Sequence, residues 1–175
     1  MTRFLPQKFQ HNESGAVAVE FGIVAVPFFT LLFAIFQIGL VFFSDQLLEA
    51  AVADAARMIR TGQASALGWG LSNFNSQVCS ELYSLLDCTK LNTYITTSGS
   101  FATLSLSPPV DPKTGAYTTT PSYDPLANTS SSIVVVSTYY EYPTIFSALG
   151  LAMADQPNNT RLLGAVAAFR NEPFP

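Results

Sequence analysis

Gly15 to Phe43 reads GAVAVEFGIVAVPFFTLLFAIFQIGLVFF, and the interpretation of the whole chain starts from this stretch. From Gly22 to Phe43 no residue is charged. As a helix that rises about 1.5 Å per residue, this run covers roughly 33 Å. That length is enough to cross a hydrocarbon core of about 30 Å. The run therefore predicts a membrane-spanning helix rather than the buried core helix of a soluble protein.

Small residues come before the apolar run and not after it, at Ser14, Gly15 and Ala16. A secretory signal peptide has a shorter apolar region, of about 7–15 residues, and its small-residue cleavage site follows that region. A cut within Ser14–Ala16 would instead leave the apolar segment on the mature protein. Glu20 lies at the edge of the run, where an ionisable side chain is costly and needs a reason.

Composition and length limit the remaining possibilities. The chain has 175 residues, of which 49% are hydrophobic and 11% are charged, well below the usual charged fraction of about a quarter. The residues after the span, Ser44–Pro175, are enough for one domain with its own core. The net charge is −4 and the basic residues are scattered, so we expect no nucleic-acid partner.

The flanking charges and the cysteines predict the orientation. Arg3 and Lys8 precede the span, whereas no basic residue follows it until Arg57. The positive-inside rule then places the N-terminus in the cytoplasm and the distal domain across the membrane. Cys79 and Cys88 fit an oxidising compartment and one structural disulfide, with two buried free thiols as the alternative. A disulfide would require the helix that carries Cys79 to end near Asp87, because a straight helix would hold the two Cα atoms about 13 Å apart.

The helix is predicted to run from Ala16 to about Arg60. Pro27 lies inside it and should bend or locally open it, which transmembrane helices tolerate. Whether Pro27 makes an ordinary kink or a point where the helix melts on subunit packing stays open. Beyond the membrane the helix carries one apolar stripe at helical spacing: Leu48, Val52, Ala55 and Ile59. Thr61-Gly62 is the predicted stop.

The rest of the chain predicts an α+β domain, in which a second helix and the Ala-rich half of the first pack on a small antiparallel sheet. The second helix is expected over 72–86. Strands are expected over 91–96, 101–107, 133–142 and 161–169, with 133–142 at the centre. Residues 107–132 are rich in proline and are expected to form a long loop without regular structure. Residues 144–153 are apolar and fit a short helix or a surface segment near the membrane or a partner.

No catalytic constellation is present in the sequence. The only histidine, His11, lies in the polar leader, no glycine-rich loop for phosphate is present, and no cluster has metal-ligand spacing. We therefore expect no enzymatic activity, no metal site and no cofactor.

The leader and the span together resemble a type IV prepilin, in which a peptidase cuts after a glycine and a glutamate stands at position five of the mature chain. Gly15, Ala16 and Glu20 fit these positions. Glu20-Phe21 stands where Flp-type pilins carry Glu-Tyr. The span with its Ala-rich continuation, the segment VCSELYSLLDC and the closing AAFRNEPF are similar to TadE-like proteins of the tight-adherence (Tad) pilus system.

This resemblance implies a pilin-like domain arrangement, with a leader over 1–15, a transmembrane and extended helix over 16–62, and an extracytoplasmic domain over 63–175. It implies a non-enzymatic minor pilin or pseudopilin in the bacterial inner membrane, acting in assembly, initiation or at the tip of a pilus. The implied partners are a prepilin peptidase, the inner-membrane assembly platform and other subunits, namely a major Flp-type pilin and a second pseudopilin. A signal-anchored envelope adaptor or receptor is the alternative function.

Cleavage after Gly15 would create a cationic amine on Ala16, about one helical turn from Glu20. Glu20 would then pair with this amine in its own chain or with the amine of a neighbouring subunit. The resemblance to pilins favours the neighbouring subunit, because that pairing selects the correct docking register. A carboxylate that merely extends to the headgroups is the alternative.

Overall fold

The structure is a computed structural model of the chain, and it describes residues 14–104, 108–111, 113–118, 120–145 and 154–174. It forms two compact units, Met1–Ile38 and Gly39–Pro175. A long apolar helix, further short helices and a four-stranded sheet make up its elements. The α+β class predicted from the sequence is therefore confirmed.

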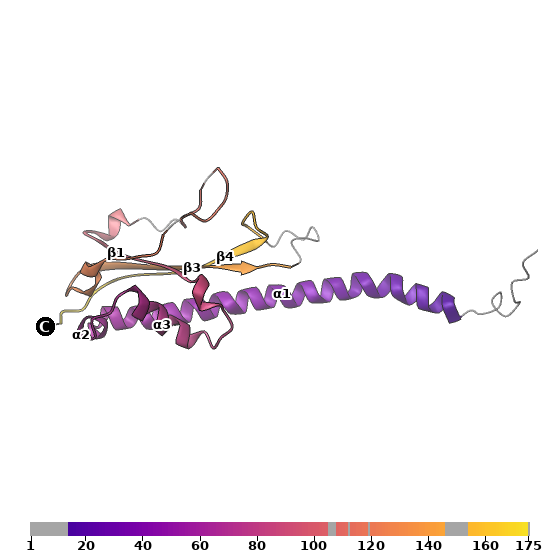
Figure 1. Cartoon of the computed structure of the whole chain (residues 1–175), viewed down its shortest axis with the longest axis horizontal. Coiled ribbons are helices and arrows are strands. Elements are labelled where there is room, and N and C mark those ends of the chain that lie inside the picture. Colours follow the sequence, from indigo (N-terminus) through magenta and orange to yellow (C-terminus); the bar gives the residue numbers. More distant parts are fainter. Residues whose placement is uncertain (1–13, 105–107, 112, 119, 146–153, 175) are drawn as a thin grey trace, which may run out of the picture. The chain divides into compact units, whose positions relative to one another are not determined.

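Helix α1 runs from Ser14 to Arg60 without a break (Figure 1), and the predicted continuous helix is confirmed. In the first unit nearly all of its large apolar side chains are exposed; Phe21 and Ile23, for example, are each 69% exposed. By length and composition the helix is sufficient to cross a membrane. Exposed apolar surface of this extent is unfavourable in water and favourable in hydrocarbon.

Pro27 lies inside α1, and the helix continues on both sides of it. Proline has no backbone N–H, so the carbonyl four residues earlier, that of Ile23, loses its usual donor. Nearby, the Thr30 hydroxyl donates a hydrogen bond of 2.8 Å to the carbonyl of Val26. The backbone is helical through Pro27, and a kink there stays a prediction.

In the second unit, one face of α1 enters the hydrophobic core. The predicted apolar stripe is confirmed, because each of its four side chains is exposed by 1% or less: Leu48, Val52, Ala55 and Ile59. Ala51 and Ala56 are buried beside the stripe. Their small side chains allow α1 to pack closely on the rest of the domain.

Two shorter helices follow, α2 (Gln63–Ala66) and α3 (Leu71–Glu81). The second helix predicted over 72–86 exists, but it ends five residues early. Tyr83 and Ser84 have φ values of 47° and 61°, and this left-handed conformation reverses the chain and cannot continue an α-helix. The reversal brings Cys88 back beside α3. Phe74 and Val78 bury the inner face of α3.

The sheet has the strand order β2-β1-β3-β4. Its strands are β1 (Asn92–Ser98), β2 (Ser122–Tyr123), β3 (Ile133–Pro143) and β4 (Thr160–Arg170). The central position of β3, its end at Pro143 and the last strand are all confirmed. The sheet is mixed rather than wholly antiparallel, because β2 pairs parallel with β1. The long connection between these two strands makes a parallel crossover possible.

Two expectations for residues 101–132 were wrong. Phe101–Thr103 forms a 3₁₀ turn instead of a strand, because the Ser100 side chain caps it by accepting the N–H of Ala102. The proline-rich segment also contains regular structure, namely β2 and a 3₁₀ turn over Pro125–Asn128. Pro125 opens that turn, where its missing N–H is not needed. Residues 105–107 of the expected strand, and 146–153 of the expected apolar segment, lie outside the described residues.

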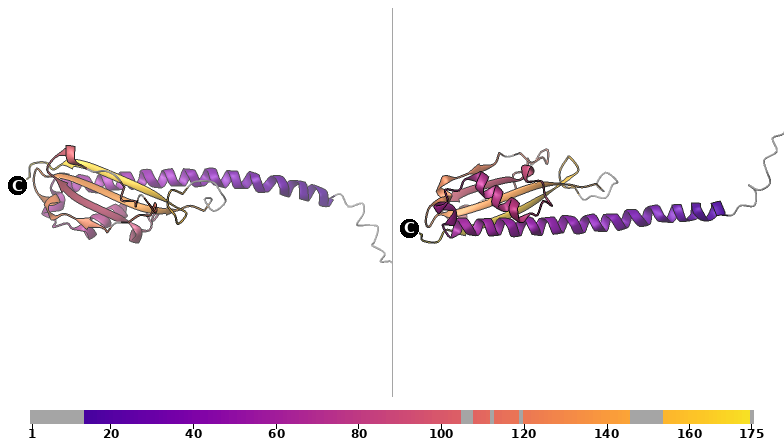
Figure 2. Two further views of the ribbon diagram at one scale, coloured as in Figure 1. Left: turned by 90° about the horizontal axis from the view of Figure 1, so that it is seen from above. Right: turned by 60° about the horizontal axis from the view of Figure 1, so that its bottom comes forward.

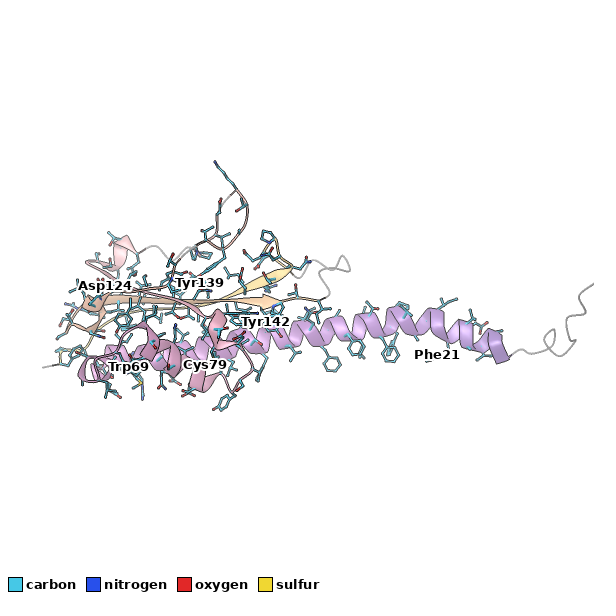
Figure 3. All side chains as sticks on the ribbon, in the orientation of Figure 1. Phe21, Trp69, Cys79, Asp124, Tyr139 and Tyr142 are labelled. Atoms are coloured by element: carbon cyan, nitrogen blue, oxygen red, sulfur yellow. A yellow bond between two sulfur atoms is a disulfide. The ribbon has the colours of Figure 1, made fainter. Side chains whose placement is uncertain are left out.

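The two faces of the sheet are packed differently (Figure 3). Val134, Val136 and Tyr140 of β3 join the core that α1 and α3 supply. On the other face, Tyr139 packs against the rings of Tyr94 and Tyr117, with ring centroids 6.0 and 5.9 Å away. The tyrosines of β3 thus serve as packing residues on both faces.

The end of α1 depends on a glycine that faces the C-terminal tail. Gly62 has a φ of 77°, and a Cβ atom on it would lie 2.6 Å from Cγ of Phe174. Gly62→Ala is expected to lower the free energy of unfolding by about 1–2 kcal/mol through the backbone alone, and further through the clash with Phe174. Urea unfolding of the full-length chain in detergent micelles, followed by near-UV circular dichroism, measures this loss.

Gly68 provides a matched control. It also has a positive φ, of 63°, but nothing lies within 4 Å of an added Cβ. Gly68→Ala should therefore show only the backbone cost. Equal losses in the two variants would contradict the role given to Phe174.

Candidate processing and assembly site

The predicted cleavage junction lies at the start of α1. The helix begins at Ser14, and Gly15 and Ala16 are exposed. A Cβ atom added to Gly15 would meet nothing within 4 Å. Packing within the chain therefore does not require glycine at this position. Recognition of the junction by another protein would be a physical reason for a residue without a side chain.

Glu20 lies one helical turn beyond Ala16 and is exposed. Its neighbours are apolar and equally open to the surroundings: Val19 is 63% and Phe21 69% exposed. Among the described residues no cation lies within ion-pair distance of Glu20. Its carboxylate therefore stands on an apolar helix surface, and an amine created on Ala16 would lie four residues away on nearly the same face.

Cys79 and Cys88 form a disulfide with their Cα atoms 5.8 Å apart. The bond joins the last turn of α3 to η2 (Cys88–Lys90), the 3₁₀ turn that leads into β1. Asp87 caps η2: its carboxylate accepts hydrogen bonds from the hydroxyl and the N–H of Thr89, which lower the pKa of that carboxyl. The Tyr140 hydroxyl accepts the N–H of Asp87 at 3.3 Å and thereby fixes the turn to β3.

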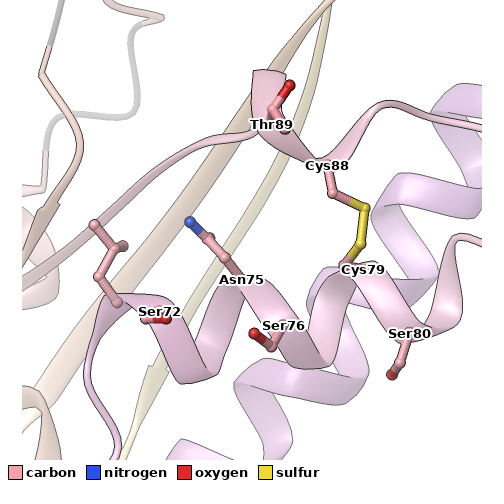
Figure 4. Close-up of a pocket in the computed structure, with 8 residues that line it drawn as sticks. Ser72, Asn75, Ser76, Cys79, Ser80, Cys88 and Thr89 are labelled. Atoms are coloured by element: carbon pink, nitrogen blue, oxygen red, sulfur yellow. A yellow bond between two sulfur atoms is a disulfide. The ribbon is translucent and has the colours of Figure 1, made fainter.

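A shallow groove of about 860 Å³ lies beside the disulfide, between α3 and η2 (Figure 4). Its polar lining consists of Ser72, Asn75, Ser76, Ser80 and Thr89. These hydroxyl and amide groups donate and accept hydrogen bonds but carry no charge. No group of three His, Cys, Asp or Glu side chains that could hold a metal ion occurs in the described part of the chain. Sequence reasoning did not identify this groove, because α3 and η2 become neighbours only when the chain reverses at Tyr83.

Removing the disulfide tests its contribution to stability. Replacing both Cys79 and Cys88 by serine is expected to lower the free energy of unfolding by about 2.5–3 kcal/mol, because the unfolded chain is no longer restricted by the small closed loop. Unfolding of the full-length chain with and without reductant measures the loss. Reductant should have no effect on the double variant, which serves as the control. A loss below about 1 kcal/mol would contradict the entropic account.

One comparison with known proteins matches the N-terminal part of the chain. The family model described as TadE-like protein matches residues 15–57, from the predicted cleavage junction to the Ala-rich part of α1. No curated protein and no solved structure matches the chain. The resemblance to TadE-like proteins stated from the sequence is thus confirmed over the matched residues, 15–57.

Proposed function

We propose that this chain is a non-enzymatic minor pilin or pseudopilin that acts in the assembly, initiation or tip of a Tad-type (Flp) pilus for surface adherence. The observation that carries the proposal is the match of residues 15–57 to TadE-like proteins on a single continuous helix. The part of this helix in the first unit is apolar and exposed, and the part in the second unit has one face buried in the domain core. One element thus supplies both a membrane anchor and the support of a distal domain.

The proposal includes a place and partners. Residues 1–15 are a leader that a prepilin peptidase removes, residues 16–62 form the transmembrane and extended helix, and residues 63–175 form the periplasmic domain. The chain passes the bacterial inner membrane once, with its N-terminus in the cytoplasm. It assembles with the major Flp-type pilin, a second pseudopilin and the inner-membrane assembly platform.

Cleavage after Gly15 is the first test. Gly15→Phe is expected to block cleavage, because the peptidase must accommodate the residue at the junction, while the helix has open space for the new ring. Intact-mass analysis of protein from cells with their own peptidase should show loss of residues 1–15 in the wild type and retention in the variant. Gly22→Phe is the matched control, since Gly22 has equally open surroundings, and this variant should be cleaved. A wild-type protein that still begins at Met1 would favour the signal-anchored adaptor or receptor instead.

Glu20 provides the second test. Glu20→Gln keeps the shape of the side chain and removes its charge, so an ion pair with the amine of Ala16 in a neighbouring subunit is lost. We expect normal membrane insertion, near-normal cleavage, and loss of piliation or of co-purification with other pilus subunits. Electron microscopy of sheared pili and affinity purification measure these outcomes.

Glu49→Gln is the control for Glu20→Gln, because Glu49 is also exposed on α1 but lies beyond the apolar run. This variant should assemble normally. If the Glu20→Gln variant forms pili normally at the wild-type protein level, the ion-pair role is contradicted. The alternative, a Glu20 carboxylate that only extends to the lipid headgroups, is then favoured.

A further inference from the structure

Among the described strands, β4 lies at one edge of the sheet and pairs with β3 alone (Figure 2). Hydrogen bonds at both ends of this pairing show which backbone groups of β4 point inward. The Asn159 carbonyl accepts the N–H of Thr144 at 3.0 Å, and the Asn171 N–H donates to the carbonyl of Ser132 at 2.8 Å. Because the direction of the backbone groups alternates along a strand, the odd-numbered residues of β4 face β3 and the even-numbered residues face outward.

The two ends of this outward edge are already occupied by other parts of the domain. The N–H of Leu162 donates to the carboxylate of Asp155 at 2.8 Å. Beyond the other end of β4, the N–H of Glu172 donates to the carbonyl of Arg60 at 2.9 Å. Partners of this kind protect a sheet edge from pairing with other chains.

The middle of the edge is not occupied in this way. The Asp45 carboxylate accepts the N–H of Gly164, but the next outward groups, on Val166 and Ala168, have no hydrogen-bond partner among the described residues. Val166 is 40% exposed, and Ala168 is also exposed. The residues between Arg161 and Arg170 carry no charge and include no proline, so two of the usual devices that block an edge, a charged side chain and a proline on the strand, are absent there.

An open groove of about 390 Å³ runs beside this window, between α1 and β4. Alanines line both walls: Ala53 and Ala56 on α1, and Ala167 and Ala168 on β4. Side chains of this size allow another backbone to approach closely.

The groove also carries charge. Arg57 and Arg60 line it together with one acid, Asp54. Arg60 is engaged by Glu172 at 3.7 Å, whereas Arg57 forms no ion pair within the described part of the chain. Arg57 is exposed and therefore suits a carboxylate brought by a binding partner.

We propose that the β4 edge from Gly164 to Arg170 binds an extended segment of a co-assembled pilus protein, which adds a strand to the sheet and places an acidic side chain beside Arg57. The inference rests on the proposed function for the nature of the partner. The outward groups of Val166 and Ala168 form the new backbone hydrogen bonds, as in other cases of strand addition. A second copy of β4 is a poorer occupant, because β4 contains two arginines and no acid to offer Arg57.

The test uses the full-length protein in detergent micelles and a fluorescein-labelled peptide of eight alternating valines and threonines with one glutamate in place of a threonine. Fluorescence anisotropy should show saturable binding. Ala168→Pro removes one outward N–H and leaves the bonds to β3 in place, so it should weaken binding roughly tenfold. Ala168→Ser keeps this N–H and is the matched control, with unchanged binding expected.

A charge exchange tests Arg57 independently of any change in the backbone. Arg57→Glu should weaken binding of the glutamate peptide, and a peptide with lysine at that position should restore it. Equal binding by the Ala168→Pro and Ala168→Ser variants, indifference of the Arg57 variant to the peptide's charge, or absence of binding to the wild type would each overturn the inference.

The peptide-binding test and the tests in cells distinguish failure of the edge inference from failure of the proposed function. A chain that is cleaved after Gly15 and supports piliation, but does not bind the peptide, refutes the edge inference alone. A chain that binds the peptide with the expected response of its variants, but is neither cleaved nor needed for pili, upholds the edge as a strand-binding surface and refutes the pilin proposal.

Discussion

The domain depends on removing one face of α1 from water. Leu48, Val52 and Ile59 are almost wholly buried in the core, and burial of such side chains stabilises a fold by about 1.5–3 kcal/mol each. The sheet supplies the opposite wall through Val134, Val136 and its neighbours on β3. Without this stripe β3 would have no apolar surface of comparable length to pack against, and the short strands β1 and β2 depend in turn on β3.

The part of α1 that lies in the first unit, Met1–Ile38, has the surface of a helix in a membrane rather than of a helix in a core. There the large apolar side chains are exposed, and a helix that satisfies its own backbone hydrogen bonds is the structure that tolerates hydrocarbon. Glu20 is the exception to this apolar surface. A carboxylate there is unfavourable unless it finds a cation, and the amine that the proposed cleavage after Gly15 would create on Ala16 is such a cation.

A disulfide and two hydrogen bonds fix the turns and the chain end that surround the helix. The disulfide holds the turn after α3 beside β1, and the Asp87–Tyr140 hydrogen bond attaches that turn to β3. At the end of α1, the N–H of Glu172 donates a hydrogen bond to the carbonyl of Arg60, which would otherwise lack a donor. In the middle of the β4 edge, by contrast, the outward backbone groups of Val166 and Ala168 have no hydrogen-bond partner among the described residues.

The sequence by itself determined the long helix, its buried stripe, its stop at Thr61-Gly62, the central strand and the last strand. These features can be predicted from the spacing of apolar residues and from glycine and proline at the ends of the elements, because both signals lie within a short stretch of sequence. The TadE-like segment was also recognisable, because its small-residue junction, acidic residue and apolar run are adjacent in the chain.

Tertiary structure alone decided the early end of α3 and the parallel pairing of β2. Each depends on a contact between residues that the sequence separates: Cys79 with Cys88, and Tyr94 with Ser122. The turn at Phe101–Thr103, in contrast, is a local feature, because the Ser100 side chain caps it by accepting the N–H of Ala102. The groove between α1 and β4 likewise has no sequence signal. Ala53 and Ala168 resemble other alanines until packing places them on facing walls, and the direction of a strand's free backbone groups is set only by the strand with which it pairs.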